Sequence, residues 1–126
     1  MTPQDVDADV WKSLAELRKR GILLAVGSSS RNAPLILERT GLLEQFDAVA
    51  DGSIISRSKP DPEVFLKAAG LLKVRPEDAL VVEDAAAGIQ AAHDGGFDAV
   101  AFGGDAAGSP LADHCIQRLS ALSELL

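Results

Sequence analysis

The chain has 126 residues, which leaves room for one hydrophobic core, and we expect residues 1–126 to form a single domain. Apolar residues make up 47% of the sequence and charged residues 25%, a balance typical of globular domains and unlike that of disordered chains. The 19 acidic residues outnumber the 12 basic ones and give a formal net charge of -7, which argues against nucleic acid as a partner.

Helical and strand patterns alternate along the chain. Val10, Leu14 and Leu17 recur at helical spacing and predict a helix over 8–20 with one buried face, which Gly21 ends. The uninterrupted apolar run at 22–26 is too short for a helix and predicts a strand that is covered on both faces. The same reasoning predicts a turn at 27–32, a helix to about 39, a strand at 48–50, a helix with Asp61 as N-cap and Pro62 as its first residue, a strand at 79–82, a helix at 85–94, a strand at 99–102, a short edge strand at 114–116 and a small helix at 119–126.

This alternation predicts the fold class. Strands too apolar to face water, separated by helices, indicate an α/β fold: a three-layer Rossmann-like parallel sheet with helices on both faces. Ligands of such sheets gather at the carboxyl ends of the strands. That rule directs attention to Ser28 after the first strand, to the loop that holds Lys59, and to the acidic pair after the strand at 79–82.

Apolar runs and cysteine content bear on the compartment. The longest apolar runs fall far short of the roughly 20 residues that cross a bilayer, and residues 1–7 are acidic rather than basic, so neither a membrane nor a secretion signal is expected. Cys115 is the only cysteine, which excludes an internal disulfide, and we expect it to pack as a small hydrophobic residue. We therefore expect a cytoplasmic protein.

Polar residues at the predicted strand ends allow two interpretations each. Glu83 and Asp84 are adjacent carboxylates that need a cation or several donors to stay ionised, and Mg²⁺ prefers such oxygens; alternatively, Asp84 caps the following helix. Ser28 lies in a serine-rich turn where a hydroxyl and backbone amides can hold a phosphate oxygen, or can simply cap a helix. Lys59 is biased toward an extended conformation by Pro60 and, taken alone, would be an ordinary solvated loop residue.

Four motifs stand in order along the chain: AVGSSSRN at 25–32, FDAVAD at 46–51, SKPDP at 58–62 and VEDAAAGIQAA at 82–92. Their residues and spacing resemble those of the haloacid dehalogenase superfamily of phosphoryl-transfer enzymes, and the sequences of the motifs look like those of its β-phosphoglucomutase branch. The resemblance extends from about residue 2 to residue 104.

The resemblance implies roles for seven residues. Ser28 and Lys59 would be catalytic, with Ser28 hydrogen-bonding the transferring phosphoryl group and Lys59 neutralising its charge. Glu83 and Asp84 would hold the cofactor Mg²⁺. Phosphate of a sugar phosphate substrate would be bound by Ser28, Ser29, Ser30, Asn32 and Lys59, with Ser30 and Asn32 serving a second phosphate. Ala85 stands where these relatives usually carry a hydroxyl residue.

One motif of the superfamily is missing. Its nucleophile is an aspartate in an Asp-x-Asp motif after the central strand, whereas here only the stretch at 5–9 has that spacing, with no apolar strand before it. The resemblance therefore implies the C-terminal part of a catalytic core, with a sheet incomplete at its central strand and without the cap domain. The absent strand would lie between the strands at 22–26 and 79–82. Those open edges would close on each other, associate with another copy or accept a separate polypeptide.

These implications predict part of a magnesium-dependent enzyme that interconverts β-glucose 1-phosphate and glucose 6-phosphate through an aspartyl-phosphate. Little or no turnover is expected from this chain alone, because phosphoryl transfer needs an aligned attacking group. Two alternatives stay open. One is a plain sugar phosphatase, and the other is a noncatalytic module that binds phosphate and magnesium or associates through its sheet edges.

Overall fold

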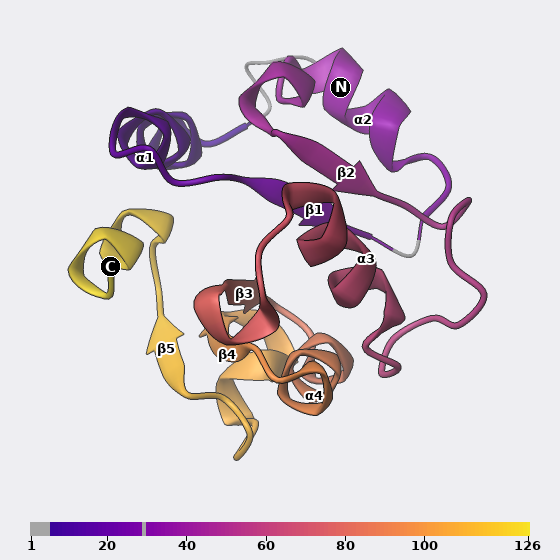
Figure 1. Cartoon of the computed structure of the whole chain (residues 1–126). Coiled ribbons are helices and arrows are strands. Elements are labelled where there is room, and N and C mark those ends of the chain that lie inside the picture. The colour runs from indigo at the N-terminus through magenta and orange to yellow at the C-terminus, as the bar shows by residue number, and fades with distance from the viewer. Residues whose placement is uncertain (1–5, 29) are drawn as a thin grey trace.

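Short parallel strands alternate with helices along the chain (Figure 1), in a computed structural model that describes residues 6–28 and 30–126. The α-helices are α1 (Ala8–Lys19), α2 (Ala33–Thr40), α3 (Glu63–Leu72) and α4 (Ala86–Gly95). The strands are β1 (Ala25–Gly27), β2 (Ala48–Ala50), β3 (Leu80–Glu83), β4 (Asp98–Phe102) and β5 (His114–Ile116). Short 3-10 helices are η2 (Leu43–Gln45), η3 (Pro76–Asp78), η4 (Gly104–Gly108) and η5 (Leu119–Glu124).

The strands form two parallel sheets. β1 pairs with β2, while β3, β4 and β5 follow one another in a second sheet. In Figure 1 the β1–β2 pair and the β3–β4–β5 sheet lie in opposite halves of the molecule, with α3 near their junction. The predicted α/β class with parallel strands is confirmed. β1 and β3 do not pair with each other. Of the three arrangements predicted for these two edges, direct pairing of one with the other is therefore not observed.

Two apolar clusters cover the two faces of the sheets. Along β4, Ala99 and Ala101 point into a cluster with α3 and α4, whereas Val100 and Phe102 point into a cluster with α1 and η5. Alternate residues of a strand face opposite sides, so β4 is buried on both. This is the three-layer arrangement that the apolar strands predict. No helix in the described part of the chain combines the length and the hydrophobicity that crossing a membrane requires.

The first strand is shorter than predicted. The run at 22–26 gives strand pairing only from Ala25, because the side chain and backbone of Asp47 take up the two backbone groups of Leu24. The Leu24 N–H donates to Asp47 Oδ2 at 2.8 Å, and the Asp47 N–H donates to the Leu24 carbonyl at 2.7 Å. A run of hydrophobic residues does not indicate a strand limit that is set by a side chain from another segment.

Two smaller predictions also need correction. The helix after the Lys-Pro pair begins at Glu63 rather than Pro62, and Asp61 acts at its start by accepting the Glu63 N–H at 3.0 Å. Cys115 is exposed on the edge strand β5 and does not pack in a core. The predicted short strand at 114–116 is confirmed.

Candidate functional site

The Lys59 ammonium joins the carboxyl ends of two strands that do not pair. Its Nζ donates to the carbonyl of Gly27, the last residue of β1, at 3.2 Å. It also donates to Oε2 of Glu83, the last residue of β3, at 2.9 Å. The loop lysine that, taken alone, would be an ordinary solvated residue therefore lies at the carboxyl ends of β1 and β3.

The Lys59 side chain is largely shielded from solvent. The Lys59 side chain is 19% exposed and that of Glu83 13%, and Nζ lies 4.9 Å from the centre of the Phe65 ring. An ion pair in such a place is less screened than one on the surface, and the face of an aromatic ring attracts a cation. An ammonium has three N–H donors, and bonds to residues in the described part of the chain use two of them, which leaves one for an anion at the strand ends.

The turn after β1 is built from hydroxyl groups that accept backbone hydrogen bonds. The Ser30 N–H donates to Ser28 Oγ at 3.1 Å, and the Asn32 N–H donates to Ser30 Oγ at 3.1 Å. The Ser28 N–H donates to the Ala50 carbonyl at 2.9 Å and ties the turn to β2. Each hydroxyl keeps its own O–H to donate.

The predicted phosphate-binding residues differ in their place along the turn that follows Gly27, whose carbonyl Lys59 contacts. Ser28 follows Gly27 directly and so lies next to the carbonyl that Lys59 holds. Ser30 and Asn32 are exposed and lie farther along, at the entry to α2, where Asn32 makes no side-chain cap. Ser29 lies outside the described residues.

Glu83 owes its position to a glycine of α4. A Cβ built on Gly88 would lie 1.9 Å from Glu83 Cγ, so the glutamate side chain fills space that only glycine leaves free. The other carboxylate oxygen, Oε1, accepts the Asp84 N–H at 3.2 Å. Asp84 itself is exposed, and within residues 6–28 and 30–126 its carboxylate has no hydrogen-bond partner.

The carboxylates at the carboxyl ends of the strands are the type of ligand that Mg²⁺ prefers, but they do not surround a metal site by themselves. Mg²⁺ is usually held by one or two carboxylates, with water and substrate phosphate completing its shell. Glu83 and Asp84 supply those carboxylates, although one oxygen of Glu83 is already paired with Lys59. No cluster of three or more acidic, histidine or cysteine side chains suited to a metal occurs among the described residues.

A groove of about 640 Å³ runs between the unpaired edges of β1 and β3. Backbone and side chains of both strands line it together with Phe65 of α3, and its lining is mostly apolar, including Leu24, Val26, Leu80 and Val82. Gly27 and Glu83, the two residues that Lys59 contacts, line this groove at the last positions of β1 and β3. An open groove thus separates the two strands whose ends carry the candidate site.

Comparison with known proteins identifies the family. The family model described as haloacid dehalogenase-like hydrolase matches residues 2–96. The chain belongs to this family. A β-phosphoglucomutase from Bacillus subtilis is 40% identical over 129 aligned positions, which cover 100% of this chain and 56% of that protein. A fructose-1-phosphate phosphatase from Escherichia coli is 40% identical over 82 positions, covering 65% of this chain and 44% of that protein.

Solved structures of the haloacid dehalogenase-like family agree with this assignment. A β-phosphoglucomutase from Clostridium difficile superposes with a TM-score of 0.88 at 29% identity, over 97% of this chain and 54% of that one. The chain therefore spans about half the length of the relatives it matches. The similar proteins include both a sugar-phosphate mutase and a sugar-phosphate phosphatase.

Asp105 is a structural residue beside the candidate site that the sequence analysis did not single out. Its Oδ1 accepts the Ala86 N–H at 2.7 Å and so caps α4, a role that the sequence had left open for Asp84. The same loop leaves no room for a side chain at position 104, because a Cβ built on Gly104 would lie 2.1 Å from the carbonyl oxygen of Asp84. The Ala106 N–H donates to that carbonyl at 3.2 Å. A Gly-Gly-Asp turn after the neighbouring parallel strand is the signal that could have indicated this contact.

Acidic residues near the N-terminus have structural roles. Asp7 caps α1 by accepting the Asp9 N–H at 2.7 Å. Asp9 in turn accepts the Ser120 N–H at 3.1 Å, and that backbone hydrogen bond is the main reason why the pKa of Asp9 lies below its usual value. Asp5 lies outside the described residues.

Proposed function

We propose that this chain is part of the catalytic core of a magnesium-dependent phosphoryl-transfer enzyme that acts on sugar phosphates. The observation that carries the proposal is the Lys59 ammonium, held between the ends of β1 and β3 by Gly27 and Glu83. A fixed cation at the carboxyl ends of parallel strands stands where such folds bind ligands, and it needs no reorganisation when an anion arrives.

Each residue at the strand ends has a proposed role. Lys59 neutralises the charge of the transferring phosphoryl group, and the O–H of Ser28 donates to one of its oxygens. Ser30 and Asn32, at the entry to α2, would serve the second phosphate of a bisphosphate, and Ser29 would add to phosphate binding in the same turn. Glu83 and Asp84 would hold Mg²⁺, which supplies further positive charge against the phosphate oxygens when it is bound.

The reaction also requires a nucleophile. None of the described strands ends in an Asp-x-Asp motif, so we propose that this chain alone has little or no turnover. The attacking carboxylate would come from a further segment placed between β1 and β3. The similarity to the Bacillus subtilis enzyme favours interconversion of β-glucose 1-phosphate and glucose 6-phosphate, whereas similarity to the Escherichia coli enzyme supports a sugar phosphatase as the alternative.

Phosphate binding tests the proposal on this chain. Inorganic phosphate, with and without Mg²⁺, is titrated into ¹⁵N-labelled protein, and shifts of the amide signals of Ser28, Asp84 and their neighbours are followed. We expect saturable shifts that Mg²⁺ strengthens and that Lys59→Met abolishes. Arg39→Met, which removes an exposed cation from α2, is the matched control. Equal binding by wild type and Lys59→Met would contradict the proposal.

The mutase and the phosphatase are separated by their products. In a protein that contains this chain together with a strand ending in Asp-x-Asp, β-glucose 1-phosphate is supplied with a bisphosphate primer. Formation of glucose 6-phosphate supports the mutase, and release of inorganic phosphate without glucose 6-phosphate supports the phosphatase. Product from neither route would reject both activities.

Association through strand edges is a second candidate function, favoured by the groove of about 640 Å³ between β1 and β3. Each of these strands is hydrogen-bonded on one side only, which leaves two rows of backbone groups facing an apolar space. The fitting occupant is an extended apolar segment that runs parallel to both strands. Sedimentation velocity with and without a soluble valine-rich peptide tests this. A complex supports it, a dimer of the chain alone points to a second copy, and an unchanged monomer contradicts it.

A further inference from the structure

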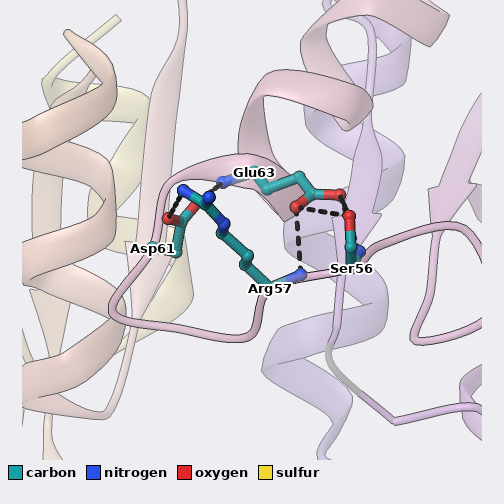
Figure 2. Close-up of polar contacts among 4 residues, drawn as sticks. All are labelled: Ser56, Arg57, Asp61 and Glu63. Atoms are coloured by element: carbon teal, nitrogen blue, oxygen red, sulfur yellow. Dashed lines mark hydrogen bonds and ion pairs between the residues drawn. The ribbon is translucent and has the colours of Figure 1, made fainter.

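The segment before Lys59 is tied to the first residue of α3. Glu63 accepts the Ser56 N–H at 2.7 Å and the Ser56 hydroxyl at 3.1 Å on Oε1, and the Arg57 N–H at 3.0 Å on Oε2 (Figure 2). Both carboxylate oxygens are thus occupied by residues that lie six and seven positions upstream. A carboxylate that only capped its own helix would accept N–H groups of that helix. Glu63 serves the loop instead.

The segment after Lys59 is tied to the same helix end. Asp61 Oδ1 accepts the Glu63 N–H at 3.0 Å, and Asp61 Oδ2 lies 3.7 Å from Nη1 of Arg57. The Asp61 N–H donates to the Ser58 carbonyl at 3.0 Å and closes a tight turn around Lys59. Lys59 therefore lies between two anchored points of one closed loop, as Figure 2 shows for the four residues that close it.

The helix that anchors the loop also holds the lysine side chain. Phe65, two residues after Glu63, carries the ring that lies 4.9 Å from Lys59 Nζ. Phe65 also packs edge-on against Phe97, with ring centres 6.2 Å apart, so its position is fixed by the core. The first turns of α3 thus set both the backbone and the ammonium of Lys59 relative to Gly27 and Glu83.

Charge favours this arrangement. The N-terminus of a helix carries a partial positive charge that stabilises a carboxylate at its first residue. The hydrogen bond from the Ser56 backbone is the main cause that lowers the pKa of Glu63 below its usual value, and burial opposes it. The carboxylate therefore stays ionised near neutral pH and holds its donors through charge-assisted bonds.

We propose that Glu63 is a positioning residue that fixes the loop at 56–61 on α3 and so holds the Lys59 ammonium at the strand ends. Its contribution to phosphate binding, but not its hold on Lys59, rests on the function proposed above. Removing its charge leaves Lys59 present but loosely placed, and a binding group that is out of place loses much of its effect.

Three variants test the proposal on this chain. Glu63→Gln removes the charge, Glu63→Asp keeps it on a shorter side chain, and Glu38→Gln changes an exposed glutamate of α2 as the matched control. The first measurement is the nuclear Overhauser effect between the Lys59 side chain and the Phe65 ring, without any ligand. The second is the Kd for inorganic phosphate.

We expect Glu63→Gln to weaken the Lys59 to Phe65 effect and to raise the Kd about three- to tenfold, the scale of a net loss of about one hydrogen bond. Glu63→Asp should recover part of both, and Glu38→Gln should match wild type. Wild-type values in Glu63→Gln would overturn the proposal. If wild type itself does not bind phosphate, the proposed function fails, while the Lys59 to Phe65 effect still decides the role of Glu63.

Amide exchange keeps the proposal testable should Glu63→Gln not fold. In wild type, the amides of Ser56 and Arg57 donate to Glu63, whereas that of Ser58 has no hydrogen-bond acceptor in the described part of the chain. After correction for sequence, we expect the Ser56 and Arg57 amides to exchange at least about tenfold more slowly than that of Ser58. Equal rates would also overturn the proposal.

Discussion

Lys59 Nζ and Glu83 Oε2 lie 2.9 Å apart and connect the ends of two strands that share no backbone pairing. The pair occupies a place where each charge has lost most of its water, with 19% and 13% of the two side chains exposed. Removing one partner from such a pair costs more than the pair contributes, because the other charge stays behind without compensation.

Substitutions at this pair are expected to be strongly coupled. Lys59→Met and Glu83→Gln should each lower the free energy of unfolding by about 1–2 kcal/mol, less than for a fully buried pair because both side chains keep some exposure. The double variant should lose at least about 1 kcal/mol less than the sum of the single changes. Urea unfolding of the four proteins measures this cycle.

An exposed ion pair provides the control for this cycle. Arg75 and Asp78 also lie 3.0 Å apart, but their side chains are 74% and 55% exposed. Arg75→Met should therefore change the free energy of unfolding by less than about 0.5 kcal/mol. Additive losses for Lys59 and Glu83 would show that the two charges do not support each other.

Gly88 is expected to tolerate no side chain. Gly88→Ala would place a methyl group 1.9 Å from Glu83 Cγ and push the glutamate away from Lys59. Such overpacking should lower the free energy of unfolding by about 1–3 kcal/mol and weaken phosphate binding. Gly70→Ala is the control, because beyond its chain neighbours and the backbone of α3 no atom of the described residues lies within 4 Å of the Cβ position of this glycine.

The control should change stability in the opposite direction. Alanine in an exposed helix interior is favoured over glycine, so Gly70→Ala should raise the free energy of unfolding by about 0.5–1 kcal/mol. Urea unfolding measures both variants. A Gly88→Ala protein as stable as wild type would mean that Glu83 moves aside at no cost.

The cap of α4 is expected to depend on Asp105 and not on Asp84. Asp105→Ala removes the oxygen that accepts the Ala86 N–H and should cost about 1 kcal/mol of stability, whereas Asp105→Asn keeps an acceptor and should cost less. Asp84→Ala should leave the stability near that of wild type. Thermal unfolding compares the three, and a larger loss for Asp84→Ala than for Asp105→Ala would return the cap to Asp84.

Sequence patterns predicted those helices and strands whose burial leaves a local pattern of apolar residues. The apolar run at 99–102 placed Val100 in a buried strand, and the spacing of Leu14 and Leu17 placed α1, because burial on both faces leaves an unbroken apolar run and burial on one face leaves a period in the sequence. The rule that ligands gather at strand ends selected Ser28, Lys59 and the acidic pair, and the structure brings Lys59 to Gly27 and Glu83. Their roles in binding stay predictions.

Contacts between distant segments were beyond such patterns. Asp47 sets the start of β1 from 23 positions away, and Asp105 caps α4 from 19 positions away, so neither acts where a local cap signal would be sought. The three bonds of Glu63 to the loop before Lys59 also depend on how that loop folds back. Hydrogen-bond partners of this kind have no period, and only the folded chain identifies them.

Protonation of Asp9 in acid is expected to release the Ser120 N–H from its acceptor. Asp9 accepts the Ser120 N–H at 3.1 Å, and Arg118 Nη2 lies 3.5 Å from its other oxygen. These contacts, with the Ser120 backbone bond first, hold the pKa of Asp9 below the usual 3.8. Because the pKa of the folded state is the lower one, the stabilisation is fully present above pH 3.8 and is lost as the pH falls through the folded value.

The amide proton of Ser120 reports this release directly. Its chemical shift, followed from about pH 6 to about pH 2, should titrate with a midpoint below 3.8 as the acceptor is protonated. Asp9→Asn has no proton to gain and should show no such step, while keeping an oxygen that can accept the bond. A wild-type midpoint at or above 3.8, or the same step in Asp9→Asn, would mean that the Asp9 carboxylate does not hold the Ser120 N–H.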